Sequence, residues 1–281
     1  MNWRQFLTPV KSIDTEAARA FLAERPAGDV TIIDVRQPAE YASGHIPGAV
    51  LIPLPELTDR IDRIDRTRPV LVYCGSGGRS RMAAQLLADA DFSEIINVAG
   101  GFNAWTSGVA FLGEEKGLAL FEDVASVEAA LVVAYSLEAG LKAFYDDMAG
   151  RVESAPARQL FHQLSQIEVK HQDRILEQYA AATGTRVTRE TFEAQKLPAV
   201  VEGGLTTEEY ANLLMPAFDS LADTIELAMS IEAQALDLYL RAARKATDET
   251  ARQALVRIAD EEKSHLARLG RLMEEILQPG A

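Results

Sequence analysis

An internal repeat places the strongest constraint on what this chain of 281 residues can fold into. Two similar stretches begin 94 positions apart: SLEAGLKAFY at Ser136 and SIEAQALDLY at Ser230. The same offset separates two Glu-x-x-His tetrads, which begin at Glu168 and Glu262. Because these features share one offset, we interpret the second half of the chain as two copies of one structural unit.

Long helices are predicted throughout this half, because strand signals end near residue 123 and Ala, Leu, Glu and Gln predominate from there. Gly150, the region of Gly184 and Pro279 are placed where helices end. The segment 184–215 includes a short helical piece and is long enough to run the length of a four-helix bundle. The expected helices cover residues 124–149, 155–182, 216–246 and 248–277.

The apolar face of each predicted helix is interrupted once, near its middle, by Glu or by Glu-x-x-His. A buried Glu without a partner costs several kcal/mol, whereas a whole domain is stable by only about 5–15 kcal/mol. A pair of cations would compensate this cost, and Glu and His three positions apart share one helical face. The pattern therefore predicts a dinuclear metal site; the alternative is a wrong helical phase, with these residues exposed. The predicted ligands are Glu138, Glu168, His171, Glu232, Glu262 and His265.

From about residue 123 to 278 the chain resembles the ferritin-like superfamily, and rubrerythrin most closely. The resemblance implies that the six residues bind two iron ions, although oxygen and nitrogen donors also suit manganese or a mixed pair. It also implies that Tyr145 and Tyr239, each seven positions after a helix Glu, hydrogen-bond ligand carboxylates. Ordinary core packing is the alternative for both tyrosines.

Two departures from the rubrerythrin pattern bear on the activity that the resemblance implies. Position 235, where rubrerythrins carry a further carboxylate, is Ala235, which leaves a symmetric set closer to bacterioferritin. The chain has one cysteine, so it lacks the four-cysteine rubredoxin domain and needs an external electron donor. Both departures weaken the expectation of peroxidase activity, and neither weakens the metal site.

The first half of the chain alternates β-branched runs with helical stretches, which predicts a parallel α/β sheet. We therefore expect an α/β domain over 1–110, a linker over 111–122 and the helical bundle over 123–281. The predicted strands are 30–35, 49–54, 69–74 and 94–100, and the predicted helices are 15–24, 55–64 and 79–90.

Cys74, the single cysteine, excludes an intramolecular disulfide and a zinc-finger cluster. It ends an apolar strand and opens a glycine-rich loop that precedes a helix. Converging backbone amides, the helix N-terminus and Arg79 would each lower a thiol pKa from about 8.5, which predicts a nucleophilic thiolate. A buried cysteine before an ordinary loop is the alternative. The predicted sulfur-binding residues are Gly75, Ser76, Gly77, Gly78 and Ser80.

Most of residues 8–110 resembles the rhodanese family. The signatures are DVR at 34–36, Glu40, GHIPGA at 44–49 and GGFNAW at 100–105. The resemblance implies that Cys74, assisted by Arg79, takes sulfur from a small-molecule donor as a persulfide and passes it to a thiophilic acceptor. The loop from Cys74 to Arg79 has six residues, typical of sulfurtransferases, whereas the related phosphatases use a longer one.

Two histidines receive no catalytic role. His45 belongs to the GHIPGA turn signature, so we expect a structural role for it. His162 lies outside every motif that we identify.

A net charge of −14 argues against nucleic acid and anionic membranes as partners. Residues 1–122 carry 12 Lys and Arg against 16 Asp and Glu, so most of the acidity belongs to the helical half. No apolar run approaches the roughly 18 residues that a membrane helix needs, and the N-terminus lacks a signal-peptide core. We expect a cytoplasmic protein, compatible with a homodimer because ferritin-like bundles often pair.

Three functions follow from these patterns. The first is a bifunctional enzyme, in which sulfur transfer accompanies redox chemistry with peroxide or dioxygen, in oxidative or reactive-sulfur stress. The second is an iron-binding or iron-oxidising protein, with the rhodanese domain as a docking or sulfur-carrier module. The third, which the intact motifs favour least, is a sensor or scaffold with both sites vestigial.

Overall fold

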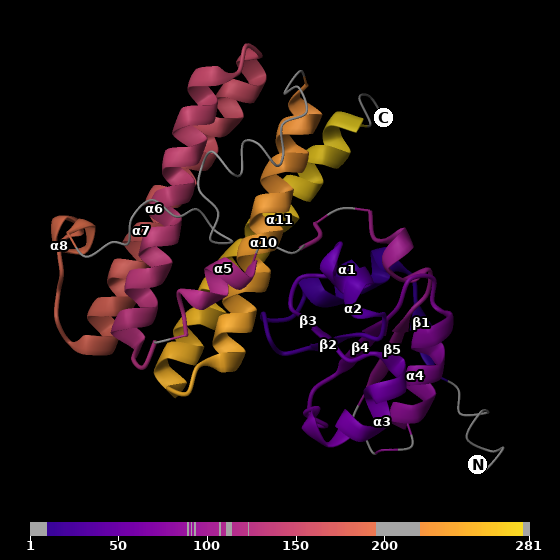
Figure 1. The fold of residues 1–281 in the computed structure, drawn as a ribbon. Helices are drawn as coiled ribbons and strands as arrows, with labels where there is room; N and C mark the ends of the chain where they lie inside the picture. Colours follow the sequence, from indigo (N-terminus) through magenta and orange to yellow (C-terminus); the bar gives the residue numbers. More distant parts are fainter. Residues whose placement is uncertain are drawn as a thin grey trace. The chain divides into compact units, whose positions relative to one another are not determined.

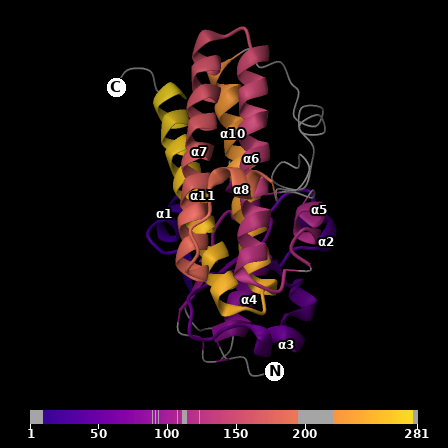
Figure 2. The ribbon, with the colours of Figure 1, turned by 90° about the vertical axis from the view of Figure 1, so that its left-hand side faces the viewer.

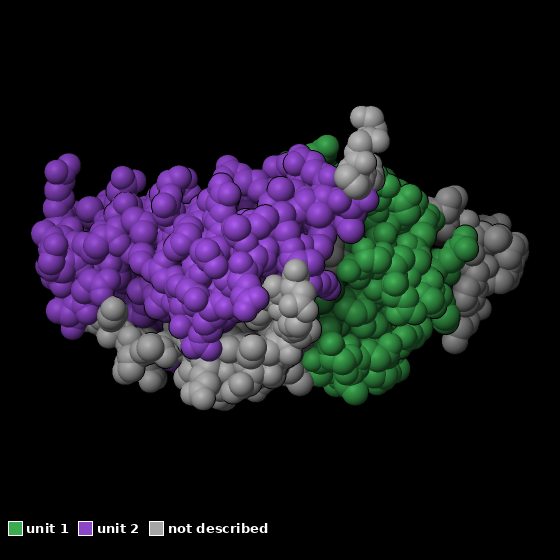
Figure 3. All heavy atoms as spheres, turned by 90° about the horizontal axis from the view of Figure 1, so that it is seen from above, with its two compact units in different colours: residues 1–112 green, residues 113–281 purple. Residues whose placement is uncertain are grey.

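The computed structural model describes residues 10–88, 90, 92, 94–106, 108–110, 114–122, 124–194 and 220–277. The chain divides into two compact units, residues 1–112 and 113–281, which Figure 3 colours separately.

Unit 1 contains a five-stranded sheet among its described residues, with the strand order β1-β5-β4-β2-β3 (Figure 1). Every neighbouring pair is parallel, which confirms the predicted α/β fold. The edge strand β1 was not predicted from the sequence, because it is short and lacks a buried apolar run. The bounds are β1 Lys11–Ile13, β2 Thr31–Asp34, β3 Ala49–Leu51, β4 Val70–Tyr73 and β5 Ile95–Val98.

Both faces of this sheet are buried, because successive strand residues point to opposite sides. Ile33 and Val72 pack on the side of Leu87 in α4, whereas Ile32 and Leu71 join the cluster on the other side. The sheet therefore carries its apolar core on two faces, as parallel sheets do. The helices of unit 1 are α1 Thr15–Ala23, α2 Pro38–Ala42, α3 Leu57–Arg60 and α4 Gly78–Ala88.

The helix predicted over 55–64 is not continuous. This region consists of the 3₁₀ turn η2 Leu54–Glu56, the single turn α3 and the 3₁₀ turn η3 Ile61–Arg63. Only Leu57 and Ile64 of residues 55–64 are buried, so packing supports separate turns rather than one amphipathic helix. A further 3₁₀ turn, η4 Gly101–Ala104, follows β5.

Unit 2 is a bundle built from two helix pairs, α6 with α7 and α10 with α11 (Figure 2). Serine side chains accept hydrogen bonds from the first-turn amides of three of these helices, at Ser126, Ser154 and Ser220. Gly184 ends α7 in the left-handed conformation, at φ 71°. The helical bundle is thus confirmed. The bounds are α6 Val127–Arg151, α7 Ala155–Thr183, α10 Leu221–Lys245 and α11 Glu249–Leu277.

Two shorter helices complete the described part of unit 2. The segment expected as a linker contains α5 Glu114–Ala119, which contacts α10, because the apolar Leu118 and Phe121 are buried there. The short helical piece expected after α7 is α8 Arg189–Glu193, and residues 195–215 of the expected crossing segment lie outside the described residues. None of the described helices combines the length and the apolar character needed to span a bilayer.

Candidate metal centre and sulfur-transfer site

The six predicted ligands lie in the interior of the bundle, at mid-length on α6, α7, α10 and α11. Glu138, Glu168 and Glu232 have no exposed surface, and His265, the least buried of the six, is 8% exposed. They are therefore interior groups, as the helical period requires if the neighbouring apolar residues form the core.

His171 connects the carboxylates of this cluster. Its Nδ1 lies 3.1 Å from Oε2 of Glu138, 3.2 Å from Oε2 of Glu168 and 3.5 Å from Oε1 of Glu262. Burial lowers the pKa of His171, but the carboxylates of Glu138 and Glu168 outweigh it and raise the pKa to about 11. A metal ion at Nδ1 would replace the proton that this environment favours.

The second imidazole lies against the first. The rings of His171 and His265 stack with centroids 4.4 Å apart, and their Nε2 atoms are 3.3 Å apart. Nδ1 of His265 faces Oε2 of Glu232 at 3.7 Å. Two overlapping groups result, each with donor atoms within 4.8 Å of one another: one joins His171 to Glu138 and Glu168, the other to Glu262 and His265.

Bound cations would satisfy the polar atoms of this cluster better than the surrounding side chains do. Neither oxygen of Glu168, nor Oε2 of Glu232, nor Nδ1 of His265 has a hydrogen-bond partner among the described residues. Burial raises the pKa of Glu168 well above its usual range. Buried polar atoms without partners are costly, and carboxylate oxygens with imidazole nitrogens suit iron or manganese.

Two tyrosines cross between the helix pairs and reach ligand carboxylates. Tyr239 on α10 donates its hydroxyl hydrogen to Oε1 of Glu138 at 2.9 Å, and Tyr145 on α6 donates to Oε1 of Glu232 at 3.5 Å. Both side chains are fully buried. The 94-residue offset relates the two contacts, so the repeat in the sequence corresponds to a two-fold arrangement of the site.

Glu261 is a neighbour of the cluster that sequence reasoning missed. Its Oε2 lies 3.8 Å from Nε2 of His171 and accepts a hydrogen bond from Arg174 at 2.8 Å. The position that the repeat equates with it is Ile167, so this carboxylate breaks the symmetry of the site. The carboxylate that rubrerythrins add on the third helix is missing, since Ala235 is a buried methyl group.

Cys74 follows β4, at the edge where the parallel strands end, and is buried. Its Sγ accepts the backbone N–H of Gly77 at 3.1 Å and lies 3.5 Å from the Ser80 hydroxyl. Burial raises the pKa of the Cys74 thiol, but hydrogen bonds from the Ser80 hydroxyl and from the amides of Ser80, Gly77 and Ser76 lower it below its usual value.

The backbone of the closing GGFNAW signature forms hydrogen bonds with the Cys74 loop. Phe102 N–H donates to the Cys74 carbonyl at 2.7 Å, and Asn103 N–H donates to the Gly75 carbonyl at 2.9 Å. Gly101 makes this approach possible, because a Cβ there would lie 2.2 Å from the Cys74 carbonyl oxygen. This contact explains why the glycine pair belongs to the motif.

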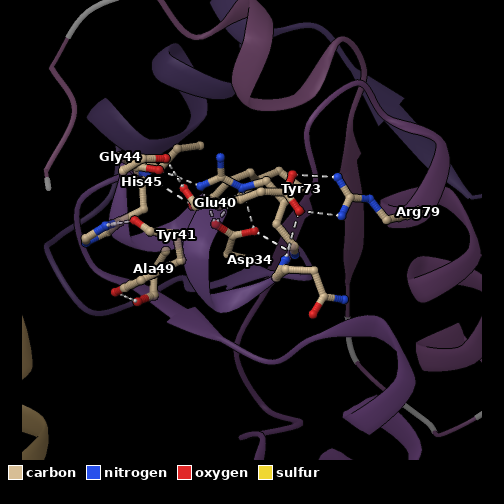
Figure 4. Close-up of polar contacts among 12 residues, drawn as sticks. Asp34, Glu40, Tyr41, Gly44, His45, Ala49, Tyr73 and Arg79 are labelled. Carbon is tan, nitrogen blue, oxygen red and sulfur yellow. Dashed lines mark hydrogen bonds and ion pairs between the residues drawn. The ribbon is translucent and has the colours of Figure 1, made fainter. Parts of the chain in front are cut away.

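Arg79, predicted to assist Cys74, forms a two-bond ion pair with Glu40 (Figure 4). Both nitrogen–oxygen distances are 2.8 Å, and the hydrogen bond from Arg79 lowers the pKa of Glu40 to about 2. The third helical position of α2 holds Glu40, where it also accepts the Gln37 N–H at 3.0 Å. The positive charge beside the loop is therefore largely neutralised.

The remaining signature residues support the fold of unit 1 (Figure 4). The guanidinium of Arg36 donates two hydrogen bonds to the Asp34 carboxylate and one to the Gly44 carbonyl, the last at 2.6 Å. His45 stacks on Tyr41 with ring centroids 3.7 Å apart and hydrogen-bonds its carbonyl, which agrees with the structural role expected for it. His162 lies on the exposed surface of α7.

Comparisons with known proteins agree with this division. The rhodanese-like domain family matches residues 17–108, and the rubrerythrin family matches residues 129–273. A sulfurtransferase of Allochromatium vinosum is 38% identical over 34% of this chain and 88% of its own length. The thiosulfate sulfurtransferase GlpE of Pseudomonas entomophila is 36% identical over 36% of this chain and 89% of its own.

A solved rhodanese-like domain protein from Staphylococcus aureus is 33% identical, covers 34% of this chain and 92% of its own, and superposes with a TM-score of 0.32. The match to the rubrerythrin family spans more than half of the 281 residues, on the bundle that holds the carboxylate and histidine cluster. The chain belongs to the rubrerythrin family, and a rhodanese-like domain precedes its helical bundle.

Proposed function

We propose that the protein is bifunctional, with sulfur transfer at Cys74 and redox chemistry at a di-iron centre in the bundle. Two observations carry this proposal together: a hydrogen-bonded thiol in a glycine loop, and a buried cluster in which five candidate ligands converge in two groups while Glu232 lies 3.7 Å from His265. A vestigial scaffold would have no reason to keep buried carboxylate oxygens that lack hydrogen bonds from the described part of the chain.

The sulfur half proceeds by two displacements on a sulfane sulfur. The Cys74 thiolate attacks the outer sulfur of thiosulfate, the donor suggested by the names of the relatives. The sulfur–sulfur bond of thiosulfate breaks, and sulfite leaves with the electron pair. A thiophilic nucleophile such as cyanide then attacks the outer sulfur of the persulfide and releases the Cys74 thiolate. The Gly77 N–H, 3.1 Å from Sγ, stabilises the thiolate that begins the first step and that the second step releases.

The metal half depends on how the chain holds its ligands. Glu138, Glu168, His171, Glu232, Glu262 and His265 would hold two iron ions, which supply electrons to peroxide or dioxygen when bound. The tyrosine hydroxyls fix one oxygen each of Glu138 and Glu232, so that the other oxygen of each stays directed into the cluster. Glu261 faces the outer nitrogen of His171, which would favour a proton on Nε2 when Nδ1 binds a metal ion.

Electrons for this half come from outside the chain. The only sulfur ligand that the sequence could offer to a built-in rubredoxin-type iron is Cys74, and such an iron needs four. Fusion with a sulfur-transfer domain supports a role in oxidative or reactive-sulfur stress as part of this proposal.

The sulfur half is tested with Cys74→Ala. Thiosulfate:cyanide sulfurtransfer should disappear in this variant, while metal content stays at the wild-type level. Unchanged turnover would refute sulfur transfer at Cys74. Because the chain has no second cysteine, no other thiol could sustain the reaction.

The metal half is tested by elemental mass spectrometry of the purified protein, followed by peroxide turnover. We expect two metal ions per chain and repeated reoxidation of the reduced protein while an electron donor is supplied. A single stoichiometric oxidation would instead favour the iron-binding function, which Ala235 and the symmetric ligand set support. Absence of both metal and thiol reactivity would identify a scaffold.

A further inference from the structure

The Ser80 hydroxyl lies within hydrogen-bonding distance of three acceptors, two in the Cys74 loop and one in the sheet. Ser80 is fully buried, and its Oγ lies 2.7 Å from Oδ1 of Asn97, 3.2 Å from the Gly77 carbonyl and 3.5 Å from Sγ of Cys74. A hydroxyl has one hydrogen to donate, so it cannot serve all three acceptors. The shortest of the three contacts directs that hydrogen to Asn97.

The sheet holds Asn97 in place for this contact. Asn97 lies in β5, beside β4, and is 3% exposed. Its Nδ2 donates to the Ser12 hydroxyl at 3.0 Å, from the paired position on β1. Because the amide nitrogen is engaged on that side, the amide oxygen faces Ser80. A line of polar groups thus runs from the exposed Ser12 on the edge strand to the buried thiol.

We propose that Asn97 is a positioning residue for sulfur transfer, which holds the hydroxyl hydrogen of Ser80 away from Cys74. This inference rests on the proposed function of Cys74. Because its hydrogen is held mainly by Asn97, the Ser80 hydroxyl donates only weakly to Sγ, at 3.5 Å, and gives the thiolate less support than a full hydrogen bond would. The thiolate is then stabilised mainly by backbone amides, above all that of Gly77.

The consequence is a thiol of moderated acidity. A thiolate loses nucleophilicity as the pKa of its thiol falls, and the best attacking thiol has a pKa near the working pH. Full donation from both Ser80 and the loop amides would make Cys74 more acidic and a weaker nucleophile. Asn97 opposes this and keeps the thiolate reactive toward a sulfane sulfur.

The charged groups around the Cys74 loop do not set the acidity of the thiol in the same way. Among the described residues, those that face it are paired with one another: Arg79 of α4 with Glu40 of α2, and Asp34 with Arg36 after β2. Strand β5 contributes Asn97 to this side of the thiol, and η4 contributes Asn103, so both elements present uncharged side chains.

The test is the pH dependence of Cys74 alkylation in the full chain, which reports this thiol alone because it is the single cysteine. In Asn97→Leu the freed hydroxyl keeps two acceptors, the Gly77 carbonyl and Sγ, and the charge of a thiolate makes Sγ the stronger of the two. We therefore expect the thiol pKa to fall by about one unit. Asn97→Asp keeps an acceptor for Ser80 and should show no fall. Should Asn97→Leu fail to fold, Asn97→Ala removes the same acceptor with less bulk.

The double variant decides whether Asn97 acts through Ser80. In a Ser80→Ala background, Asn97→Leu should leave the alkylation profile unchanged, which a merely structural effect on the strand would not do. An equal fall in both backgrounds would overturn the inference. So would an unchanged or raised pKa in Asn97→Leu, which would mean that the amide donates to Ser80.

Alkylation needs no sulfur donor, so its outcome is separate from that of the proposed function. A Cys74→Ala protein that still transferred sulfur would refute sulfur transfer at Cys74, whereas the alkylation profiles would still decide the role of Asn97. If both hold, the transfer rate of Asn97→Leu should reach half its maximum at a pH lower by the same shift.

Discussion

Tyr239 and Tyr145 occupy equivalent positions in the two halves of the bundle but hold their carboxylates unequally. The contact from Tyr239 to Glu138 is 2.9 Å, whereas that from Tyr145 to Glu232 is 3.5 Å. We expect Tyr239→Phe to weaken metal binding roughly 10-fold, the lower end of what such supporting contacts contribute, and Tyr145→Phe to weaken it less. Competition with a coloured chelator measures both. Equal losses would show that core packing, not the hydrogen bond, is what the tyrosines provide.

The Glu40–Arg79 pair predicts a pH dependence of stability. A carboxyl whose pKa is lowered in the fold stabilises the protein above its unfolded pKa, and this contribution is lost as the pH falls through the folded pKa. For Glu40 that window runs from 4.5 down to about 2. Both side chains are more than one-third exposed, so solvent screening keeps the effect small.

Urea unfolding followed by tryptophan fluorescence can measure this effect, since both tryptophans belong to unit 1. The difference in unfolding free energy between the wild type and Glu40→Gln should shrink across this window. A difference that stays constant with pH would contradict the prediction.

The burial of the six candidate metal ligands could be predicted from the sequence because the helical period alone decides which face is buried. Glu168 and His171 interrupt an apolar stripe, and no knowledge of other helices is needed to see it. The Glu40–Arg79 and Ser80–Asn97 contacts join residues 39 and 17 positions apart across different elements. No local period encodes such contacts, which depend on how strands and helices are assembled.

At the scale of elements, the long helices were predictable to within a few residues because their ends carry local signals. Ser126 and Ser154 cap two N-termini, and Gly184 ends α7. Elements without such signals were missed. Strand β1 is short and lies at an edge. The sequence around α5 predicts a linker because its few apolar residues are buried by tertiary contacts, among them those with α10.

The helices bring carboxylates into the core of the bundle, where hydrogen bonds from the described residues do not satisfy all their oxygens. Neither oxygen of Glu168 has a hydrogen-bond partner among the described residues. We therefore expect Glu168→Gln, which removes the cost of holding this carboxyl protonated in the core, to stabilise the metal-free bundle by about 1–3 kcal/mol. The same variant should lose most of the rise in melting temperature that metal gives the wild type. Thermal unfolding followed by circular dichroism, with and without metal, measures both, and a destabilised metal-free variant would contradict the prediction.

The stability of the metal-free bundle should change with pH in the direction opposite to the contribution of Glu40. The folded state raises the pKa of His171 from 6.5 to about 11, so its contribution is complete below 6.5 and is lost as the pH rises toward 11. The raised pKa of Glu168 acts in the same direction. The free energy of unfolding of the metal-free bundle should therefore fall with rising pH over this range.

Metal-loaded protein should show a flatter profile, because cations take the place of the proton on His171. Urea unfolding at a series of pH values, followed by helical circular dichroism, compares the two forms. Parallel slopes would mean that the proton and the metal do not share this site.

At the scale of the whole molecule, the division into residues 1–112 and 113–281 assigns the two candidate sites to different units. Each unit has its own apolar core, one around the sheet and one within the bundle. The thiol and its polar neighbours belong entirely to the first unit, and the six ligands belong entirely to the second. The packing within each core therefore gives no reason for the stability of one site to depend on the other site.

This separation predicts that removal of metal destabilises only one of the two units. A ligand that binds only the folded state stabilises the unit that holds it, so a chelator should lower the thermal transition of the bundle, followed by circular dichroism. The transition followed by tryptophan fluorescence, which reports unit 1, should stay where it is. Cys74→Ala should give the same pair of responses, because the thiol contributes no ligand. A fluorescence transition that moved with the metal would show that the two units unfold as one cooperative body.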